Sequence, residues 1–204
     1  MSIFYEPNTA TEIHRRNLPH WSQQERVYFV TFRLADSIPH DRLTQIKAER
    51  EQWQAYHRQP YSEVEWLEYH RLFSDRVESW LDDNVGQCQL ARPECAKIVA
   101  QAFEHFNKQR YRLDYWVIMP NHVHILLMTL EPHCLQDILH SWKSYTATAI
   151  NKHCGSTGQL WQHESFDHIV RSSLQLDKFR KYIVENAAKC SHKAILSTKT
   201  LDGA

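Results

Sequence analysis

The chain has 204 residues, of which 42% are hydrophobic and 24% charged, and its 24 Lys+Arg balance its 24 Asp+Glu. This composition is typical of a soluble globular protein, and the length suits one domain. No apolar run approaches the roughly 20 residues that cross a bilayer, and the four glycines form no Gly-rich loop, which excludes the P-loop and Rossmann classes.

The cysteines and the N-terminal residues indicate an intracellular protein. The five cysteines are scattered and lack C-x-x-C spacing, so we expect neither a zinc knuckle nor a disulfide framework. The first 30 residues contain no apolar stretch of the secretory-signal kind. We therefore expect reduced thiols and a cytoplasmic location.

The charges are unevenly distributed along the chain. Residues 41–94 hold 7 Lys+Arg and 11 Asp+Glu, a net charge of −4. Residues 139–204 hold 9 Lys+Arg and 5 Asp+Glu, a net charge of +4. Binding of a polyanion is therefore expected on the basic C-terminal third.

In chain order, the first half predicts an arm, a strand and an acidic helical stretch. Residues 1–25 are polar and are expected to form an irregular arm. Residues 26–34 (RVYFVTFRL) are rich in β-forming residues and predict a strand. A helical pattern runs from about 42 to 84, and Pro93 begins a further predicted helix at about 94–108.

The second half alternates strands and helices. Strands are predicted at 111–119 and 122–130, a helix at 135–153, a strand within 160–171 and a last helix at 174–190.

The order of these elements predicts an α+β fold. Apart from the acidic helices and the last helix, it is the split β-α-β plan of a ferredoxin-like domain with an antiparallel sheet. We expect a single domain over 26–190, with a helical insertion at about 41–92 and a frayed C-terminal tail at 191–204.

The most informative feature is a pair of histidines in a predicted strand. His122 and His124 are separated by Val123, and residues two apart in a strand point to the same face. The strand therefore presents two imidazoles side by side, which is half of a metal site. The alternative is a strand with two half-buried histidines satisfied by hydrogen bonds.

The last predicted helix offers two further polar groups. Tyr182 and Asn186 are four residues apart and share a helix face. If this helix packs across the sheet, the metal ligands would be His122, His124 and Asn186, beside the Tyr182 phenol. Mixed nitrogen and oxygen ligands suit Mg²⁺ or Mn²⁺, and Mn²⁺ is the better match to imidazole. Tyr182 alone would equally fit an ordinary packing aromatic.

Five segments together resemble a known family. They are residues 28–33 (YFVTFR), 119–124 (MPNHVH), 141–146 (SWKSYT), 160–171 (LWQHESFDHIVR) and 182–186 (YIVEN). In order and spacing the chain resembles the single-tyrosine HUH transposases, IS200-like enzymes, and most closely the REP-associated tyrosine transposases of bacteria. The resemblance runs from about residue 26 to 190, and MPNHVH is its most specific part.

The resemblance implies a function and roles for residues. It implies an enzyme that cleaves and rejoins single-stranded DNA at hairpin-forming repeats such as REP palindromes. His122 and His124 would bind the metal, and Tyr182 on the C-terminal helix would form a 5′-phosphotyrosine link. Asn186 falls where the family places its third polar ligand. The family's Asn-Pro is Asn186-Ala187 here, which removes a helix stop and no chemical group.

The resemblance also implies partners and surroundings. The partner would be single-stranded or hairpin DNA in the bacterial nucleoid, without a membrane, and the protein would be a monomer or a homodimer. DNA contacts are expected from five basic side chains of the C-terminal third: Lys143, His168, Arg171, Lys178 and Lys181. Structural pairing is the alternative role for the first three.

Two questions stay open from the sequence. Tyr145 competes with Tyr182 as the nucleophile, although only Tyr182 has an asparagine four residues on and the basic flank of Lys178, Arg180 and Lys181. The chain also fits a non-catalytic hairpin-binding protein that kept the fold. A His-x-His hydrolase that activates water on its metal, without a covalent adduct, is a third class.

Overall fold

The computed structural model describes residues 2–15, 19–57, 62–190 and 194–201. The chain forms two compact units. Residues 1–35 and 89–204 make up the larger unit, and residues 36–88 make up the smaller one. The two histidines and the last helix both belong to the larger unit.

The larger unit is built on a five-stranded antiparallel sheet. Its strands are β3 (Val27–Arg33), β4 (Tyr111–Ile118), β5 (His122–Thr129), β6 (Phe166–Ile169) and β7 (Ile195–Thr198), in the order β6-β3-β5-β4-β7. The first four in chain order have the ferredoxin-like arrangement, in which β3 and β5 are the central strands. The predicted α+β fold with an antiparallel sheet is confirmed.

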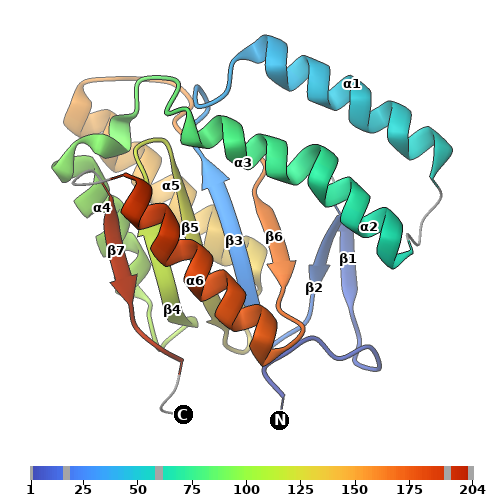
Figure 1. Ribbon diagram of the computed structural model, residues 1–204. Coiled ribbons are helices and arrows are strands. Elements are labelled where there is room, and N and C mark those ends of the chain that lie inside the picture. The colour runs from blue at the N-terminus through green and yellow to red at the C-terminus, as the bar shows by residue number, and fades with distance from the viewer. Residues whose placement is uncertain (1, 16–18, 58–61, 191–193, 202–204) are drawn as a thin grey trace. The chain divides into compact units, whose positions relative to one another are not determined.

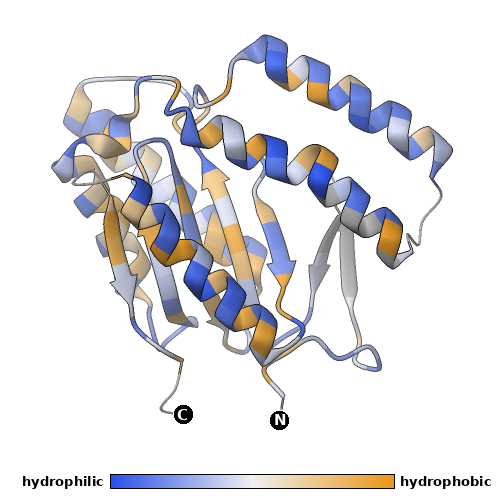
Figure 2. Ribbon diagram, in the orientation of Figure 1, coloured by the Kyte–Doolittle hydropathy of each residue, from blue (hydrophilic) through white to orange (hydrophobic). Residues whose placement is uncertain are grey.

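Helices cover both faces of this sheet (Figure 1). On one face, α4 (Pro93–His105) and α5 (Leu135–Cys154) bury a large apolar core that includes Phe32, Phe103 and Trp142. On the other face, α6 (Ser173–Lys189) covers a smaller core that includes Phe29. In Figure 2 the apolar residues of α6 interrupt a helix that is otherwise mostly hydrophilic. That pattern is typical of a helix with one buried face.

The smaller unit is helical. It contains α1 (His40–Tyr56), α2 (Glu63–Tyr69), a π-helical turn η1 (His70–Ser74) and α3 (Asp75–Asp82). Its small core holds Ile46, Tyr69 and Phe73, and the Arg42 guanidinium donates to Asp83 at 2.9 Å. The acidic stretch of the sequence thus forms helices, as its periodicity predicts.

Three short strands depart from the sequence prediction. β1 (Glu12–Arg15) and β2 (Pro19–Ser22) pair antiparallel within the stretch that we expected to be an irregular arm. β7 lies in the tail that we expected to be frayed, and it pairs with β4 at the sheet edge. Each strand is only four residues long, so its partner strand, rather than its own sequence, decides its conformation. No helix in the described ranges combines the length and apolar character needed to cross a bilayer.

Candidate metal and nucleophile site

The two histidines lie on the face of the sheet that α6 covers. In the β3–β5 register, Thr31 is opposite His124 and Arg33 is opposite His122. The His122 and His124 side chains are fully buried, and their Nε2 atoms are 3.0 Å apart. The shared strand face predicted by the His-x-His spacing therefore brings both rings to one point.

Hydrogen bonds at the far side of each ring set its orientation. The Nδ1 atom of His122 lies 2.7 Å from Oδ1 of Asn121, and Nδ1 of His124 lies 2.8 Å from Oγ1 of Thr31. An amide oxygen only accepts, so His122 carries its hydrogen on Nδ1 and has a lone pair on Nε2. If Thr31 also accepts from His124, both Nε2 lone pairs point into the same space, as they do in ligands of one metal ion.

The electrostatic surroundings keep both rings neutral. Burial lowers the pKa of His122 to about 3, and the charge of Lys189 acts in the same direction. The pKa of His124 is also well below its ordinary value, first because of burial and then because of His122 and Lys189. A neutral imidazole is the form that binds a metal, so no proton has to leave these rings when an ion enters.

Helix α6 brings Tyr182 to the histidines. The helix begins after Ser172, whose Oγ accepts a hydrogen bond from the Gln175 amide at 3.2 Å. Phe179 stacks on Phe29 with ring centroids 4.3 Å apart. One turn later, the Tyr182 ring packs edge-on against the His124 ring, with ring centroids 5.1 Å apart. The aromatic contact with β3 thus sets where Tyr182 lies along the sheet.

Asn186 lies one turn beyond Tyr182 on the same helix face. Its side chain is buried, and its Nδ2 donates to the backbone oxygen of Tyr182 at 2.9 Å. Its Oδ1 is buried and has no hydrogen-bond partner among the described residues. A buried acceptor without a partner is unfavourable, by about 1–3 kcal/mol, unless something else binds it.

These groups fit a divalent cation. Metal–ligand bonds of about 2.1 Å at a right angle separate the two ligand atoms by about 3.0 Å, and the two Nε2 atoms are 3.0 Å apart. The Oδ1 atom of Asn186, on the helix that covers the histidines, has no partner among the described residues and is the type of atom that hard cations prefer. His122 and His124 would hold the ion. Asn186, on the facing helix, would be the source of an oxygen ligand, because its Oδ1 atom has no hydrogen-bond partner in the described part of the chain.

The five expected DNA contacts fall into two groups. Lys143 donates to the backbone oxygens of Gln162 and His163, at 3.0 and 3.1 Å. The His168 Nε2 atom lies 2.9 Å from Nε2 of Gln175. Lys143 and His168 are therefore tied into the structure, which leaves their DNA role a prediction.

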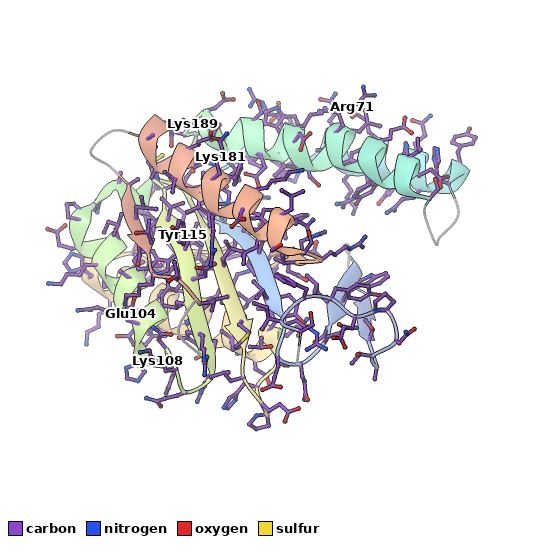
Figure 3. The ribbon with its side chains drawn as sticks, turned by 60° about the horizontal axis from the view of Figure 1, so that its bottom comes forward. Arg71, Glu104, Lys108, Tyr115, Lys181 and Lys189 are labelled. Carbon is purple, nitrogen blue, oxygen red and sulfur yellow. The ribbon has the colours of Figure 1, made fainter. Side chains whose placement is uncertain are left out.

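The remaining three expected contacts are exposed. Arg171 extends over the Tyr5 ring, 5.7 Å from its centroid, while Lys178 and Lys181 lie on α6. Lys181 makes a loose, solvent-exposed ion pair of 3.6 Å with Glu185. Figure 3 labels Lys181 and Lys189 on this helix. These side chains are placed where a polyanion can reach them.

Tyr145 lies elsewhere. It is 58% exposed on α5, where it lines a groove of about 590 Å³ between α4 and α5. That helix covers the opposite face of the sheet from the two histidines. The geometry therefore favours Tyr182 over Tyr145 as the phenol of this site.

Sequence reasoning missed three residues that complete the surroundings. Thr31 and Asn121 orient the two imidazoles, and Lys189 acts on both through its charge. Lys189 is seven residues after Tyr182, two helical turns along the same face, so its spacing was a usable signal. Thr31 was not foreseeable as a partner, because its position depends on the β3–β5 register.

An antiparallel α+β domain with a His-x-His pair beneath a tyrosine-bearing helix is a distinctive combination of fold and side chains. Residues 87–186 match the family described as "Transposase IS200 like", a stretch that includes both histidines, Tyr182 and Asn186. Over this stretch the chain is similar to the IS200-like transposases.

Other comparisons give weaker likenesses. The chain is similar to the solved structure of a REP-associated tyrosine transposase bound to a REP hairpin, with 13% identity and a TM-score of 0.46, covering 87% of this chain and 75% of that one. It is also similar to a provisionally assigned transposase from Deinococcus radiodurans R1, with 15% identity and a TM-score of 0.34, covering 85% of this chain and 95% of that one. No curated protein matches.

Proposed function

We propose that the protein is a REP-associated type of tyrosine transposase. It cleaves and rejoins single-stranded, hairpin-forming repeat DNA with Mg²⁺ or Mn²⁺ as its cofactor. The observation that carries this proposal is the edge-on contact of 5.1 Å between Tyr182 and His124, whose Nε2 atom faces that of His122. A phenol beside a histidine pair that can bind a metal is an arrangement in which the tyrosine can act as a nucleophile.

The reaction conserves the number of phosphodiester bonds. The Tyr182 oxygen forms a bond to the scissile phosphorus, and the bond from phosphorus to the 3′ oxygen breaks. The phenol loses its proton and the departing 3′ oxygen takes one, so a 5′-phosphotyrosine and a free 3′-hydroxyl result. Rejoining is the reverse attack by a 3′-hydroxyl, which returns Tyr182 to its phenol form without an external energy source.

The chain's own residues have separate tasks in this scheme. His122, His124 and Asn186 hold the metal, which when bound polarises the phosphate. Asn121 and Thr31 keep the imidazole nitrogens directed at it. The packing of α6 on Phe29 excludes water from one side of Tyr182. The hairpin substrate rests on the family motifs, and the basic third of the chain supports an anionic partner.

The test is a covalent-adduct assay. Labelled single-stranded repeat DNA is incubated with protein and Mn²⁺, and adducts are resolved on a denaturing gel. We expect an adduct with the wild type, none with Tyr182→Phe, and hairpin binding by both, because the substitution removes one oxygen and keeps the ring. Tyr145→Phe is the matched control and should retain cleavage within about tenfold, a barrier change of about 1.4 kcal/mol at most.

Other outcomes of this assay would support a different nucleophile or a different function. An adduct with Tyr182→Phe but not with Tyr145→Phe would move the nucleophile to α5. Hairpin binding without an adduct from any variant or substrate would favour the non-catalytic binding protein. Multiple turnovers of cleavage that continue in Tyr182→Phe would favour a hydrolase that activates water.

A further inference from the structure

A buried ion pair ties α6 to the sheet close to Tyr182. Arg180 of α6 donates through Nε to Oδ2 of Asp114 at 2.9 Å and through Nη2 to Oδ1 at 3.2 Å. The Asp114 side chain is 0% exposed and that of Arg180 is 16% exposed. Two parallel charge-assisted bonds fix direction as well as distance. The pair therefore restrains α6 more narrowly than apolar contacts do.

Strand β4 is irregular at the position of Asp114. Leu113 is opposite Leu127, and Trp116 is opposite Ile125, so three steps along β4 match two steps along β5. This is a β-bulge with one extra residue in β4. As a result Leu113 and Trp116 both belong to the core under α4 and α5, although in a regular strand residues three apart would point to opposite faces.

The bulge presents two neighbouring side chains to α6. Asp114 pairs with Arg180, and Tyr115 packs against the core on the α6 side. The Arg180 guanidinium also lies 5.5 Å from the centroid of the Tyr115 ring. Figure 3 labels Tyr115 on β4, next to α6. The extra residue in β4 thus places Asp114 and Tyr115 where both contact Arg180 of α6.

Arg180 and Tyr182 lie at opposite borders of the buried face of α6. Residues two apart are about 200° apart around a helix. Phe179, Ile183 and Asn186 fall in the arc between them, and this arc faces the sheet. Holding Arg180 at the β4 border therefore fixes the rotation of α6 about its axis. The position of the Tyr182 ring at the β3 border follows from that rotation.

We propose that Asp114 and Arg180 are positioning residues that hold α6 at the rotation in which Tyr182 can attack the phosphate. The inference rests on the proposed function of Tyr182 and adds how that residue is aligned. A buried ion pair contributes little net stability compared with apolar residues of similar volume, so its geometry is its main contribution. Arg180 is also removed from the cations available to DNA, in contrast to its exposed neighbours Lys178 and Lys181.

The main test variant is Asp114→Asn combined with Arg180→Gln, because removing both charges leaves no buried charge uncompensated; Asp177, which also pairs with Arg180 at 3.5 Å, is 68% exposed to solvent. We expect unchanged hairpin affinity and a single-turnover rate of adduct formation about 100-fold lower at saturating DNA, the effect of a displacement of about 1 Å at a reacting atom. Each single substitution should lower the rate about as much as the double, since the pair acts as one unit. Arg180→Lys should recover part of the rate, because an ammonium still pairs with Asp114.

Two controls separate positioning from stability. Val99→Ala destabilises the core beneath α4, and Glu185→Gln removes the exposed ion pair with Lys181 on α6. Both should keep the wild-type adduct rate per folded molecule. If the double variant also keeps that rate, the proposed positioning role is wrong.

A readout without DNA makes the test independent of the proposed function. The ring resonances of His124, assigned by comparison with a His124 variant, depend on the Tyr182 ring 5.1 Å away. We expect them to shift in the double variant and not in Val99→Ala. Unchanged His124 resonances would overturn the positioning role even if no substrate ever gives an adduct, whereas a missing wild-type adduct with shifted resonances would count only against the transposase chemistry.

Discussion

The two faces of the sheet share the same strands but differ in the polar side chains that they bury. Under α4 and α5, two core indoles donate hydrogen bonds: Trp142 to the Tyr111 hydroxyl at 3.0 Å and Trp161 to Thr146 at 2.8 Å. The Nε1 atom of Trp116 in the same core has no hydrogen-bond partner among the residues that the structure describes. Under α6, the Asn186 oxygen has no partner in the described part of the chain, and two neutral imidazoles face each other. A buried oxygen without a partner beside two neutral imidazoles is a departure from local rules of stability of the kind expected at a functional site.

The histidine face should show the largest effect on activity. We expect His124→Ala to lower cleavage by at least about 10³-fold, a barrier increase of about 4 kcal/mol, because the metal loses one of two nitrogen ligands. The matched control is Thr146→Ala on the other face, which breaks a buried hydrogen bond and lowers the free energy of unfolding by about 1–3 kcal/mol. Its folded molecules should cleave normally. Wild-type cleavage that continues undiminished in EDTA would contradict the metal role.

Packing substitutions should separate stability from activity. Phe103 is fully buried and contacts Phe32, Trp116 and Trp142, so Phe103→Ala should lower the free energy of unfolding by about 3–5 kcal/mol. Phe179 is only partly buried on α6, so Phe179→Ala should lower it by about 2 kcal/mol.

The same pair should rank in reverse for cleavage. Phe179→Ala removes the stack on Phe29 that sets where Tyr182 lies, and it should reduce the adduct rate per folded molecule far more than Phe103→Ala. Urea unfolding and single-turnover cleavage measure the two quantities. The comparison between the faces fails if both variants lose activity only in proportion to the folded fraction.

The sequence was enough to predict the long helices and strands, and to predict which residues share a face within one element. The His-x-His spacing predicted two rings on one face, and the separation of Tyr182 and Asn186 predicted a shared helix face. Those inferences need only the periods of a strand and a helix. The β4 bulge was not predictable, because an extra residue shows only against the register of the partner strand.

The role of Arg180 illustrates the same limit. In the sequence it stands between Lys178 and Lys181 and reads as part of a basic flank. In the structure it points inward to Asp114, a residue 66 positions earlier in the chain. Contacts between distant segments depend on how the layers pack, and single-sequence patterns carry little information about that. The short strands β1, β2 and β7 escaped prediction because pairing, rather than composition, determines them.

The titratable side chains of the two faces should lose their contributions to stability at opposite ends of the pH scale. The folded pKa of His122, about 3, is below its unfolded value of 6.5. The unfolded chain therefore binds more protons, and stability is lost as the pH falls below 6.5, by up to about 1.4 kcal/mol per pH unit for each such histidine. On the other face, burial raises the pKa of Tyr28 and Tyr111, so their contribution is lost as the pH rises above about 10.

Urea unfolding of the metal-free protein across pH measures both limbs. We expect His122→Asn combined with His124→Asn to flatten the acid limb and leave the alkaline limb. Tyr111→Phe should flatten the alkaline limb and leave the acid one. Because the chain has 14 histidines, the difference in slope between wild type and variant is the quantity to compare. An acid limb that is as steep in the double variant as in wild type would show that the histidine pair is not its source.

The smallest effects should come from exposed lysines, and they decide which face DNA meets. Lys178 and Lys181 lie on α6, whereas Lys152 is exposed on α5, on the opposite face. If DNA lies along α6, each of the first two substitutions to alanine removes about one phosphate contact. The slope of log K against log salt should then fall by about 0.7–0.9 for each, with little change in sequence preference. Lys152→Ala should leave the slope as it is.

Fluorescence anisotropy with a labelled hairpin at several salt concentrations gives these slopes. A loss with Lys152→Ala and none with Lys178→Ala or Lys181→Ala would place the DNA on the α4–α5 face, away from Tyr182, and would separate the basic surface from the proposed chemistry.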